Sequence, residues 1–193
     1  MKPNIFNYAK SELTNDAIIC WMLDWTNSEH EIYKNLSQDM IRLFTKNKDL
    51  DVESVKIKKQ YKNIDVLVEV NDSEVIVIED KVKTSSHSNQ LERYKDTRDN
   101  EEFYKNKNNH YIYYNVGNES QNNGVEKAGY TRIKRDEILN IIKKYRDLNN
   151  DLLNDYIDYL ESIEKTSNKY KEEDDINKWD WETWEGNYNY LQL

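Results

Sequence analysis

Two neighbouring segments, IDVLVEV and VIVIEDKV, carry charged residues at the edge of runs of β-forming residues. A turn-like Asn-Asp-Ser tripeptide separates the two runs, which predicts an antiparallel hairpin of strands over 64–70 and 75–82. Because side chains alternate along a strand, Glu79 and Lys81 share one face of the second strand. Pairing of the two strands can therefore bring Asp65 close to Glu79 and Lys81.

These residue types suit the hydrolysis of a phosphodiester. The carboxylates of Asp65 and Glu79, with a backbone carbonyl such as that of Asp80, form a hard oxygen site for Mg²⁺ or Mn²⁺. Such a cation polarises a phosphodiester oxygen and lowers the pKa of a bound water. Lys81, one pleat from Glu79, can orient or deprotonate that water or stabilise the developing charge. An isolated Glu-x-Lys pattern is also typical of an exposed ion pair on an edge strand, which is the structural alternative.

Two further pairs of residues could join this site. Gln90 and Tyr94 lie four residues apart on a predicted polar helix, so they share a face and could reach a phosphate or the attacking water. Glu12 and Asp16 share a face at the start of an earlier predicted helix, and either could point into the site. An ordinary helix face explains the first pair equally well, and a favourable interaction with the helix dipole explains the second.

The elements that must position these residues follow from apolar periodicity, β-forming runs and turn signals. We expect a helix, a helix, three strands, a helix, a strand and two helices, which predicts an α/β (α+β) sandwich with a small mixed sheet of about four strands flanked by helices. The expected helices cover about 13–26, 29–46, 87–105, 134–146 and 150–164, and the expected strands cover 55–60, 64–70, 75–82 and 110–116.

The length and the charge distribution predict a domain over 1–165 and a distinct segment over 166–193. The 193 residues carry a net charge of -9, but residues 1–146 are formally neutral and residues 147–193 supply the whole excess. The terminal segment is acidic and contains three of the five tryptophans. It could pack its aromatic side chains on the domain, dock a protein partner, or cover the site as an acidic mimic of nucleic acid.

Other chemistries find little support in the sequence. The single cysteine, Cys20, indicates a reducing compartment, and the three histidines have no zinc-ligand spacing. There is no phosphate-binding glycine loop, and no apolar run of membrane-spanning length or signal-peptide pattern. We therefore expect a cytoplasmic protein with no membrane association. A basic cluster over 56–62 is consistent with a nucleic-acid partner.

Over residues 5–145 the sequence resembles the PD-(D/E)XK nuclease superfamily. The motif stands here as Ile64-Asp65 followed by Glu79-Asp80-Lys81, with Ile64 in the place of the usual proline. The stretch QLERY is similar to the Q-x-x-x-Y motif of the RecB-like exonuclease branch, and SELTNDAIICWMLDW resembles the start of an uncharacterised bacterial subfamily. The resemblance implies a restriction-endonuclease-like core and a set of roles: metal binding by Asp65 and Glu79, catalysis by Lys81, support of the metal site by Glu12, and assistance from Gln90 and Tyr94.

Together these observations predict a Mg²⁺-dependent (or Mn²⁺-dependent) nuclease that hydrolyses DNA. One alternative is a catalytically silent binding module that keeps the nuclease fold for nucleic acid or a protein partner. A third hypothesis is a toxin or phage-defence effector that cuts only when triggered, with the acidic segment holding it inactive. The sequence leaves the oligomeric state and the form of the nucleic acid open.

Overall fold

The central β-sheet arises from four strongly β-forming runs and one short strand. The computed structural model describes residues 4–9, 11–62, 64–81, 90–99, 104–118 and 123–191. Within this part of the chain, one sheet has the strand order β1-β2-β3-β4-β5. Its strands are β1 (Val55–Tyr61), β2 (Ile64–Val70), β3 (Glu74–Lys81), β4 (Asn108–Asn115) and β5 (Thr131–Ile133).

The sheet is mixed, as the sequence predicts. Short connections make β1, β2 and β3 an antiparallel meander, and β4 and β5 then pair in parallel with β3 and β4, respectively. A parallel neighbour requires a long crossover, and the segment containing α3 supplies it between β3 and β4. The start of β2 and the end of β3 therefore lie at the same edge of the sheet. This edge carries Asp65, Glu79 and Lys81.

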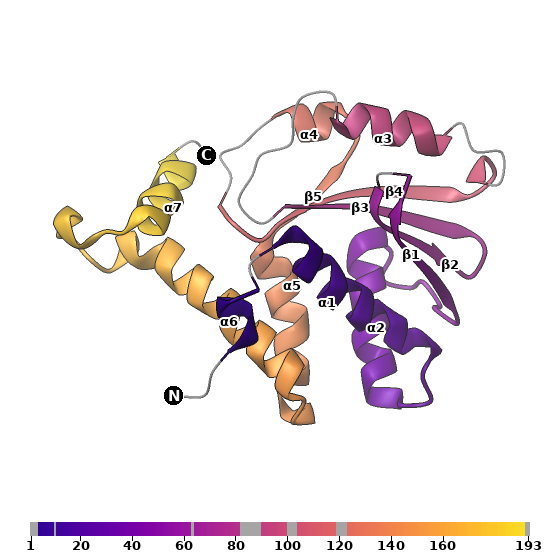
Figure 1. The fold of residues 1–193 in the computed structure, drawn as a ribbon, viewed down its shortest axis with the longest axis horizontal. Helices are drawn as coiled ribbons and strands as arrows, with labels where there is room; N and C mark the ends of the chain where they lie inside the picture. The colour runs from indigo at the N-terminus through magenta and orange to yellow at the C-terminus, as the bar shows by residue number, and fades with distance from the viewer. Residues whose placement is uncertain are drawn as a thin grey trace.

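Helices cover both faces of the sheet (Figure 1). The larger core joins α1, α2, α5 and α6 to residues such as Val66, Val68 and Ile78, while the smaller core joins α3 and α4 to Leu67 and Val77. The helices are α1 (Glu12–Asp24), α2 (Glu31–Thr45), α3 (Gln90–Asp99), α4 (Asn123–Lys127), α5 (Arg135–Ile142), α6 (Asp151–Asn168) and α7 (Trp181–Leu191). Shorter 3-10 helices are η1 (Ile5–Asn7), η2 (Trp25–Asn27), η4 (Lys143–Leu148), η5 (Lys169–Lys171) and η6 (Ile176–Lys178).

The predicted mixed α/β architecture is confirmed, with differences in detail. The sheet has five strands rather than about four, because the three-residue β5 is too short to give a sequence signal. The same holds for the five-residue helix α4, which lies between the expected strand over 110–116 and the expected helix over 134–146, where no element was expected. The helix expected over 87–105 is described over Gln90–Asp99; residues 87–89 and 100–103 lie outside the described part, and residues 104 and 105 are not α-helical.

The acidic terminal segment forms α7 and packs on α6. Thr183 is fully buried and donates a hydrogen bond to the Thr166 carbonyl at 3.0 Å. Figure 1 shows α7 against the far end of α6, on the opposite side of the molecule from β1 and β2. Trp181 and Tyr188 remain exposed. The described part of the segment thus packs through one face of α7 on the end of α6, which continues across the predicted boundary at residue 165 to Asn168.

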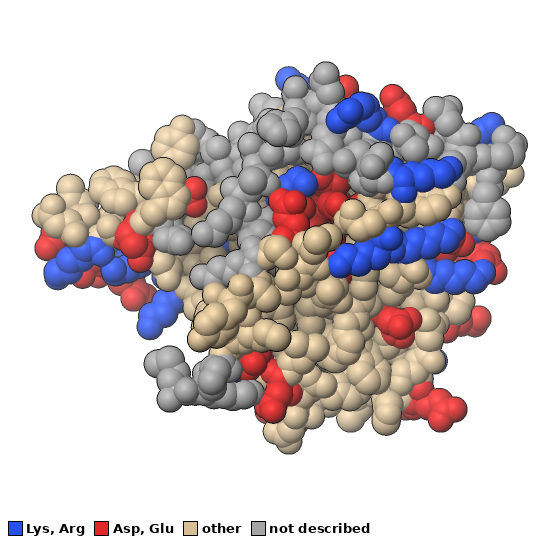
Figure 2. Space-filling view, viewed as in Figure 1, with Lys and Arg blue, Asp and Glu red and all other residues tan. Residues whose placement is uncertain are grey.

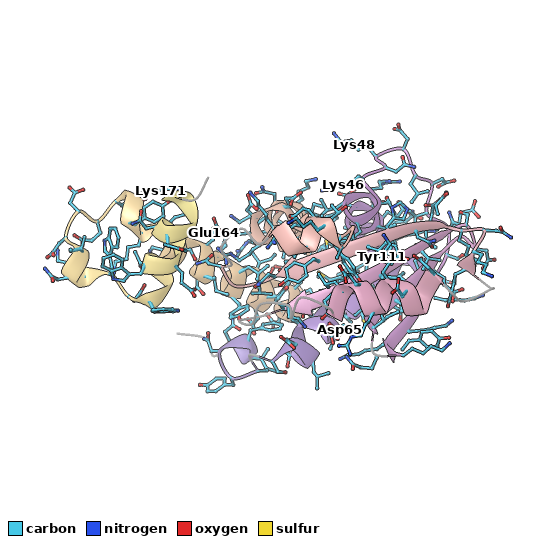
Figure 3. All side chains as sticks on the ribbon, turned by 90° about the horizontal axis from the view of Figure 1, so that it is seen from above. Lys46, Lys48, Asp65, Tyr111, Glu164 and Lys171 are labelled. Atoms are coloured by element: carbon cyan, nitrogen blue, oxygen red, sulfur yellow. The ribbon has the colours of Figure 1, made fainter. Side chains whose placement is uncertain are left out.

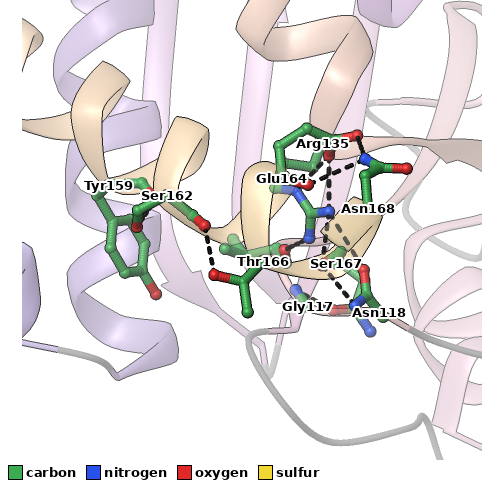
Figure 4. A network of polar contacts seen from close by, with 11 residues as sticks. Gly117, Asn118, Arg135, Tyr159, Ser162, Glu164, Thr166, Ser167 and Asn168 are labelled. Atoms are coloured by element: carbon green, nitrogen blue, oxygen red, sulfur yellow. Dashed lines mark hydrogen bonds and ion pairs between the residues drawn. The ribbon is translucent and has the colours of Figure 1, made fainter. Parts of the chain in front are cut away.

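Arg135 ties the end of β4 to α6 (Figure 4). Its guanidinium donates to the Val116 carbonyl at 2.7 Å, to the Glu164 carboxylate at 2.7 and 2.9 Å, and to the Asn118 side chain at 3.2 Å. The planar, multiply donating guanidinium suits this arrangement better than a lysine would. The buried arginine therefore holds α5, α6 and the strand end in one fixed relation.

Candidate active site

Asp65 lies where β2 and β3 stop pairing regularly. The antiparallel ladder between the two strands ends at the Val66–Ile78 pair. One residue further, the Asp65 carboxylate accepts a hydrogen bond from the Asp80 backbone N–H, with 3.1 Å between Oδ2 and N. A side-chain oxygen thus takes the place of a ladder carbonyl. The two strands separate at the position of the predicted acids.

Glu79 and Lys81 form a close ion pair on one face of β3. The distance between Lys81 Nζ and Glu79 Oε1 is 2.6 Å, and both side chains are buried. Their face is the one that packs Val75 and Val77 in the smaller core, as strand alternation predicts. Glu12, at the first turn of α1, places Oε2 4.0 Å from Lys81 Nζ and is 41 % exposed. The ion pair is therefore next to a side chain that reaches solvent.

Asp80 points to the other face of β3 and joins it to α1. Its Oδ1 accepts a hydrogen bond of 2.6 Å from the Asn15 amide, and Asn15 Oδ1 accepts one of 2.6 Å from the Tyr156 hydroxyl. All three residues are buried. The sequence indicated the direction of Asp80 but not these partners. The prediction that its backbone carbonyl is a metal ligand remains a prediction.

Asp16 and Gln60 complete the neighbourhood of Asp65. Asp16 is buried one turn of α1 after Glu12. The Gln60 amide nitrogen lies 3.5 Å from Asp16 Oδ2 and 3.4 Å from Asp65 Oδ1. Figure 2 shows acidic atoms gathered near the middle of one face, with Lys and Arg atoms beside them over β1 and β2. The contact of Gln60 with Asp16 was not expected, because regular alternation would have placed Gln60 with Lys58 on the face of Glu79 and Lys81, away from α1.

The closeness of these acids alters their proton affinities. Burial, and then the Asp65 carboxylate, raise the pKa of Glu79 to about 8, although Lys81 opposes the shift. Burial and Asp65 likewise raise the pKa of Asp16 to about 6. Burial alone would lower the pKa of Lys81, but its hydrogen bond to Glu79 and the surrounding acids raise it above the ordinary value. Lys81 is therefore held as an ammonium at neutral pH, which suits charge stabilisation better than proton abstraction.

The donor set at this edge fits a hard divalent cation. Asp65 and Glu79 offer carboxylate oxygens within hydrogen-bonding reach of each other, and Asp16 has a buried oxygen, Oδ1, that receives no hydrogen bond. Oxygen ligands of this kind are those that Mg²⁺ and Mn²⁺ prefer. Within the described residues, no group of three or more Asp, Glu, His or Cys side chains is arranged so that it could hold a metal ion by itself. Water or substrate oxygens would have to complete the coordination, as is usual for Mg²⁺.

Gln90 and Tyr94 both lie on α3, which begins at Gln90. The four-residue spacing therefore places them one turn apart on a real helix, as predicted. Their side chains lie outside the described part of the structure, so the assisting roles that the resemblance implies stay predictions.

No described helix is long and apolar enough to cross a membrane.

A mixed sheet flanked by helices, with paired acids and a lysine where two strands separate, defines a nuclease-type architecture. The model of the PD-(D/E)XK nuclease superfamily matches residues 3–171, most of the chain, and the protein belongs to this superfamily. The match ends before α7. No curated protein and no solved structure matches the chain. The RecB-like branch and the bacterial subfamily remain predictions.

Proposed function

We propose that this protein is a Mg²⁺-dependent (or Mn²⁺-dependent) deoxyribonuclease. The observation that carries the proposal is the meeting of Asp65, Glu79 and Lys81 at one edge of the sheet, with Glu12 of α1 alongside. Burying such charges costs several kcal/mol unless they are paired or bind a ligand, so a purely structural strand has little reason to collect them. Membership of the nuclease superfamily supports the same chemistry.

The roles of the residues follow from their chemistry. Asp65 and Glu79, with the Asp80 carbonyl, would hold the cation, which supplies Lewis-acid activation of the phosphodiester and of water when bound. The Lys81 ammonium can donate to the water or to a phosphate oxygen and offset the negative charge that develops there. Glu12 balances that ammonium from the solvent side. Gln90 and Tyr94 are proposed to orient the phosphate or the water.

The charges around the site are consistent with a polyanionic substrate. Lys56 and Lys59 are exposed on β1, and Figure 2 shows basic atoms over this part of the sheet, beside the acidic group. A nearby positive surface attracts a phosphate backbone and offsets the repulsion from the carboxylates. The excess negative charge lies in residues 147–193, which are distant from β1 in the fold (Figure 1).

The test is cleavage of plasmid, linear and single-stranded DNA with and without Mn²⁺. Wild-type protein should cleave at least one of these only when Mn²⁺ is present, and Asp65→Ala and Lys81→Ala should each slow cleavage by a factor of about 100 or more. Lys46→Ala is the matched control, since Lys46 pairs with Glu137 at 3.0 Å and Figure 3 shows Lys46 well apart from Asp65. Cleavage by both site variants at the wild-type rate would refute the assignment.

The burial of the Glu79–Lys81 pair supports a second candidate, a nuclease fold retained as a binding module without turnover. A buried ion pair in which the two side chains contact each other could be purely structural. The two functions differ in their response to metal. The nuclease should gain thermal stability from Mn²⁺, and Asp65→Asn should remove the gain. A module that has lost the metal site should show no gain in either form.

A further inference from the structure

Gln60 has a backbone conformation that its neighbours in β1 do not share. Its φ of 54° lies in the left-handed region, which residues other than glycine and asparagine rarely adopt in a strand. On either side the ladder with β2 is regular, with Lys59 opposite Val66 and Tyr61 opposite Ile64. One residue is thus turned out of an otherwise continuous strand. Lys62, in the turn that follows β1, also has a positive φ of 50°, but within the strand itself only Gln60 adopts this conformation. Backbone strain of this kind is found preferentially at functional sites.

The unusual backbone determines where the side chain points. In a regular strand, Gln60 would share the face of Lys58, whose ammonium pairs with Glu69 at 2.6 Å and donates to the Tyr104 hydroxyl at 2.9 Å. Instead its amide nitrogen is directed to Asp16 on α1 and Asp65 on β2, at 3.5 and 3.4 Å. Both contacts are long for hydrogen bonds, so the amide only partly satisfies the two carboxylates.

The position of this amide resembles that of a cation. It donates two N–H groups to carboxylates of different elements, and Asp16 is 1 % exposed with a second oxygen that no donor reaches. A primary amide can lie between two such carboxylates without introducing a further charge, because its N–H groups carry partial positive charge and the group has no net charge. An amide nitrogen cannot itself coordinate a metal ion. It would have to move away if one entered.

We propose that Gln60 is a placeholder: its amide separates Asp16 and Asp65 in the metal-free protein and leaves this position when a divalent cation binds at the site. This positioning role rests on the proposed function and extends it to a residue on β1. Gln60 is exposed, so its side chain can swing into solvent without disturbing the core. Departure of the amide also frees the backbone to relax from its left-handed conformation.

The test measures binding of Mn²⁺ alone, by the loss of the electron paramagnetic resonance signal of the free ion, with no nucleic acid present. Gln60→Gly removes the amide and accepts the φ of 54° without strain, and it should bind Mn²⁺ about three- to ten-fold more tightly than wild type. Gln60→Lys introduces a permanent ammonium and should bind at least about ten-fold more weakly, while its metal-free form melts at a higher temperature. Gln60→Asn is the second variant, for the case that Gln60→Gly folds poorly. Asparagine tolerates the left-handed region but its amide has a shorter reach, so this variant should also bind Mn²⁺ more tightly than wild type.

The control variant is Gln38→Ala, which removes an amide that donates to the Val52 carbonyl at 2.9 Å; its Mn²⁺ affinity should match wild type. Unchanged or weaker binding by Gln60→Gly and Gln60→Asn would overturn the placeholder role, and weaker binding would indicate that the side chain is a ligand. Asp65→Asn is measured in parallel. If wild type does not bind Mn²⁺, the proposed function and the placeholder both fail; if it binds and only Asp65→Asn loses binding, the placeholder alone fails.

Discussion

The amide of Asn15 donates a hydrogen bond of 2.6 Å to the buried carboxyl of Asp80 and so fastens the first helix to the strand that carries the candidate catalytic residues. This contact sets where Glu12 lies relative to Lys81, because Glu12 and Asn15 are three residues apart, about one turn of α1. The buried Tyr156 hydroxyl supports Asn15 from α6. Three elements that are distant in the sequence thus meet behind the site.

Removing the Asn15 amide should destabilise the protein measurably. Asn15→Ala leaves the Asp80 carboxyl, which is fully buried, without its donor, and we expect a loss of about 2 to 3 kcal/mol in the free energy of unfolding. Urea unfolding followed by circular dichroism measures this. Gln38→Ala, which removes a half-buried amide, should cost less than about 1 kcal/mol. Equal losses in the two variants would contradict the role assigned to Asn15.

The stability of the metal-free protein should fall as the pH rises from 5.5 to 8.5. The pKa of Glu79 is raised from 4.5 to about 8 and that of Asp16 from 3.8 to about 6, so the folded state holds these protons more tightly than the unfolded state. Their contribution is complete below the ordinary values and is lost as the pH passes the raised ones. We expect a loss on the order of 2 kcal/mol across this range in the presence of a chelator.

The contribution of Glu79 to this decline in stability can be measured separately. Asp65 promotes its protonation and Lys81 opposes it, while the raised pKa of Lys81 places its own titration above the range tested. Glu79→Gln should flatten most of the decline between pH 5.5 and 8.5. Urea midpoints at several pH values measure both proteins, and a wild-type stability that rises over this range would show that Glu79 is ionised throughout.

Adding one methyl group to α7 should loosen the terminal helix and leave the domain folded. A Cβ at Gly186 would lie 1.9 Å from the Ser167 carbonyl oxygen, so α7 cannot keep its position on α6 in Gly186→Ala. We expect a loss of about 1 to 3 kcal/mol and a red shift of tryptophan fluorescence, since Trp179 and Trp184 pack together with ring centroids 4.8 Å apart.

The same variant tests whether the acidic segment restrains the proposed activity. Because the described part of the segment packs on α6 rather than over Asp65, DNA cleavage by Gly186→Ala should equal that of wild type. A truncation after Lys171 should also leave cleavage unchanged. This end point is preferable to one at residue 165, because α6 continues to Asn168. Faster cleavage by either variant would instead support the hypothesis of a covered, triggered nuclease.

The arrangement of Glu79, Asp80 and Lys81 could be predicted because it depends on local alternation. Their strand is apolar on both faces, so the charged residues at its end inherit the directions of the valines and isoleucines before them. The hairpin with β2 followed from the turn between the strands. The general position of Asp65 at the same edge was predictable for the same reason.

The rest of the site depends on departures from that regularity. Ile64 packs in the smaller core although alternation would place it with Val66 in the larger one, so β2 is irregular around Asp65. Gln60 is redirected by a left-handed backbone that no neighbouring proline or glycine announces. The partners of Asp80 come from α1 and α6, whose docking on the sheet is a long-range event without a local signal.

The irregular strand β1 also affects how copies of the protein interact with one another. β1 is an edge of the sheet, with no strand on its outer side in the described structure, and an open edge is a template on which another chain can add. Exposed lysines along β1 and the kink at Gln60 oppose such addition through charge repulsion and loss of a straight hydrogen-bonding row. These features protect the unpaired outer side of β1 against aggregation by strand addition.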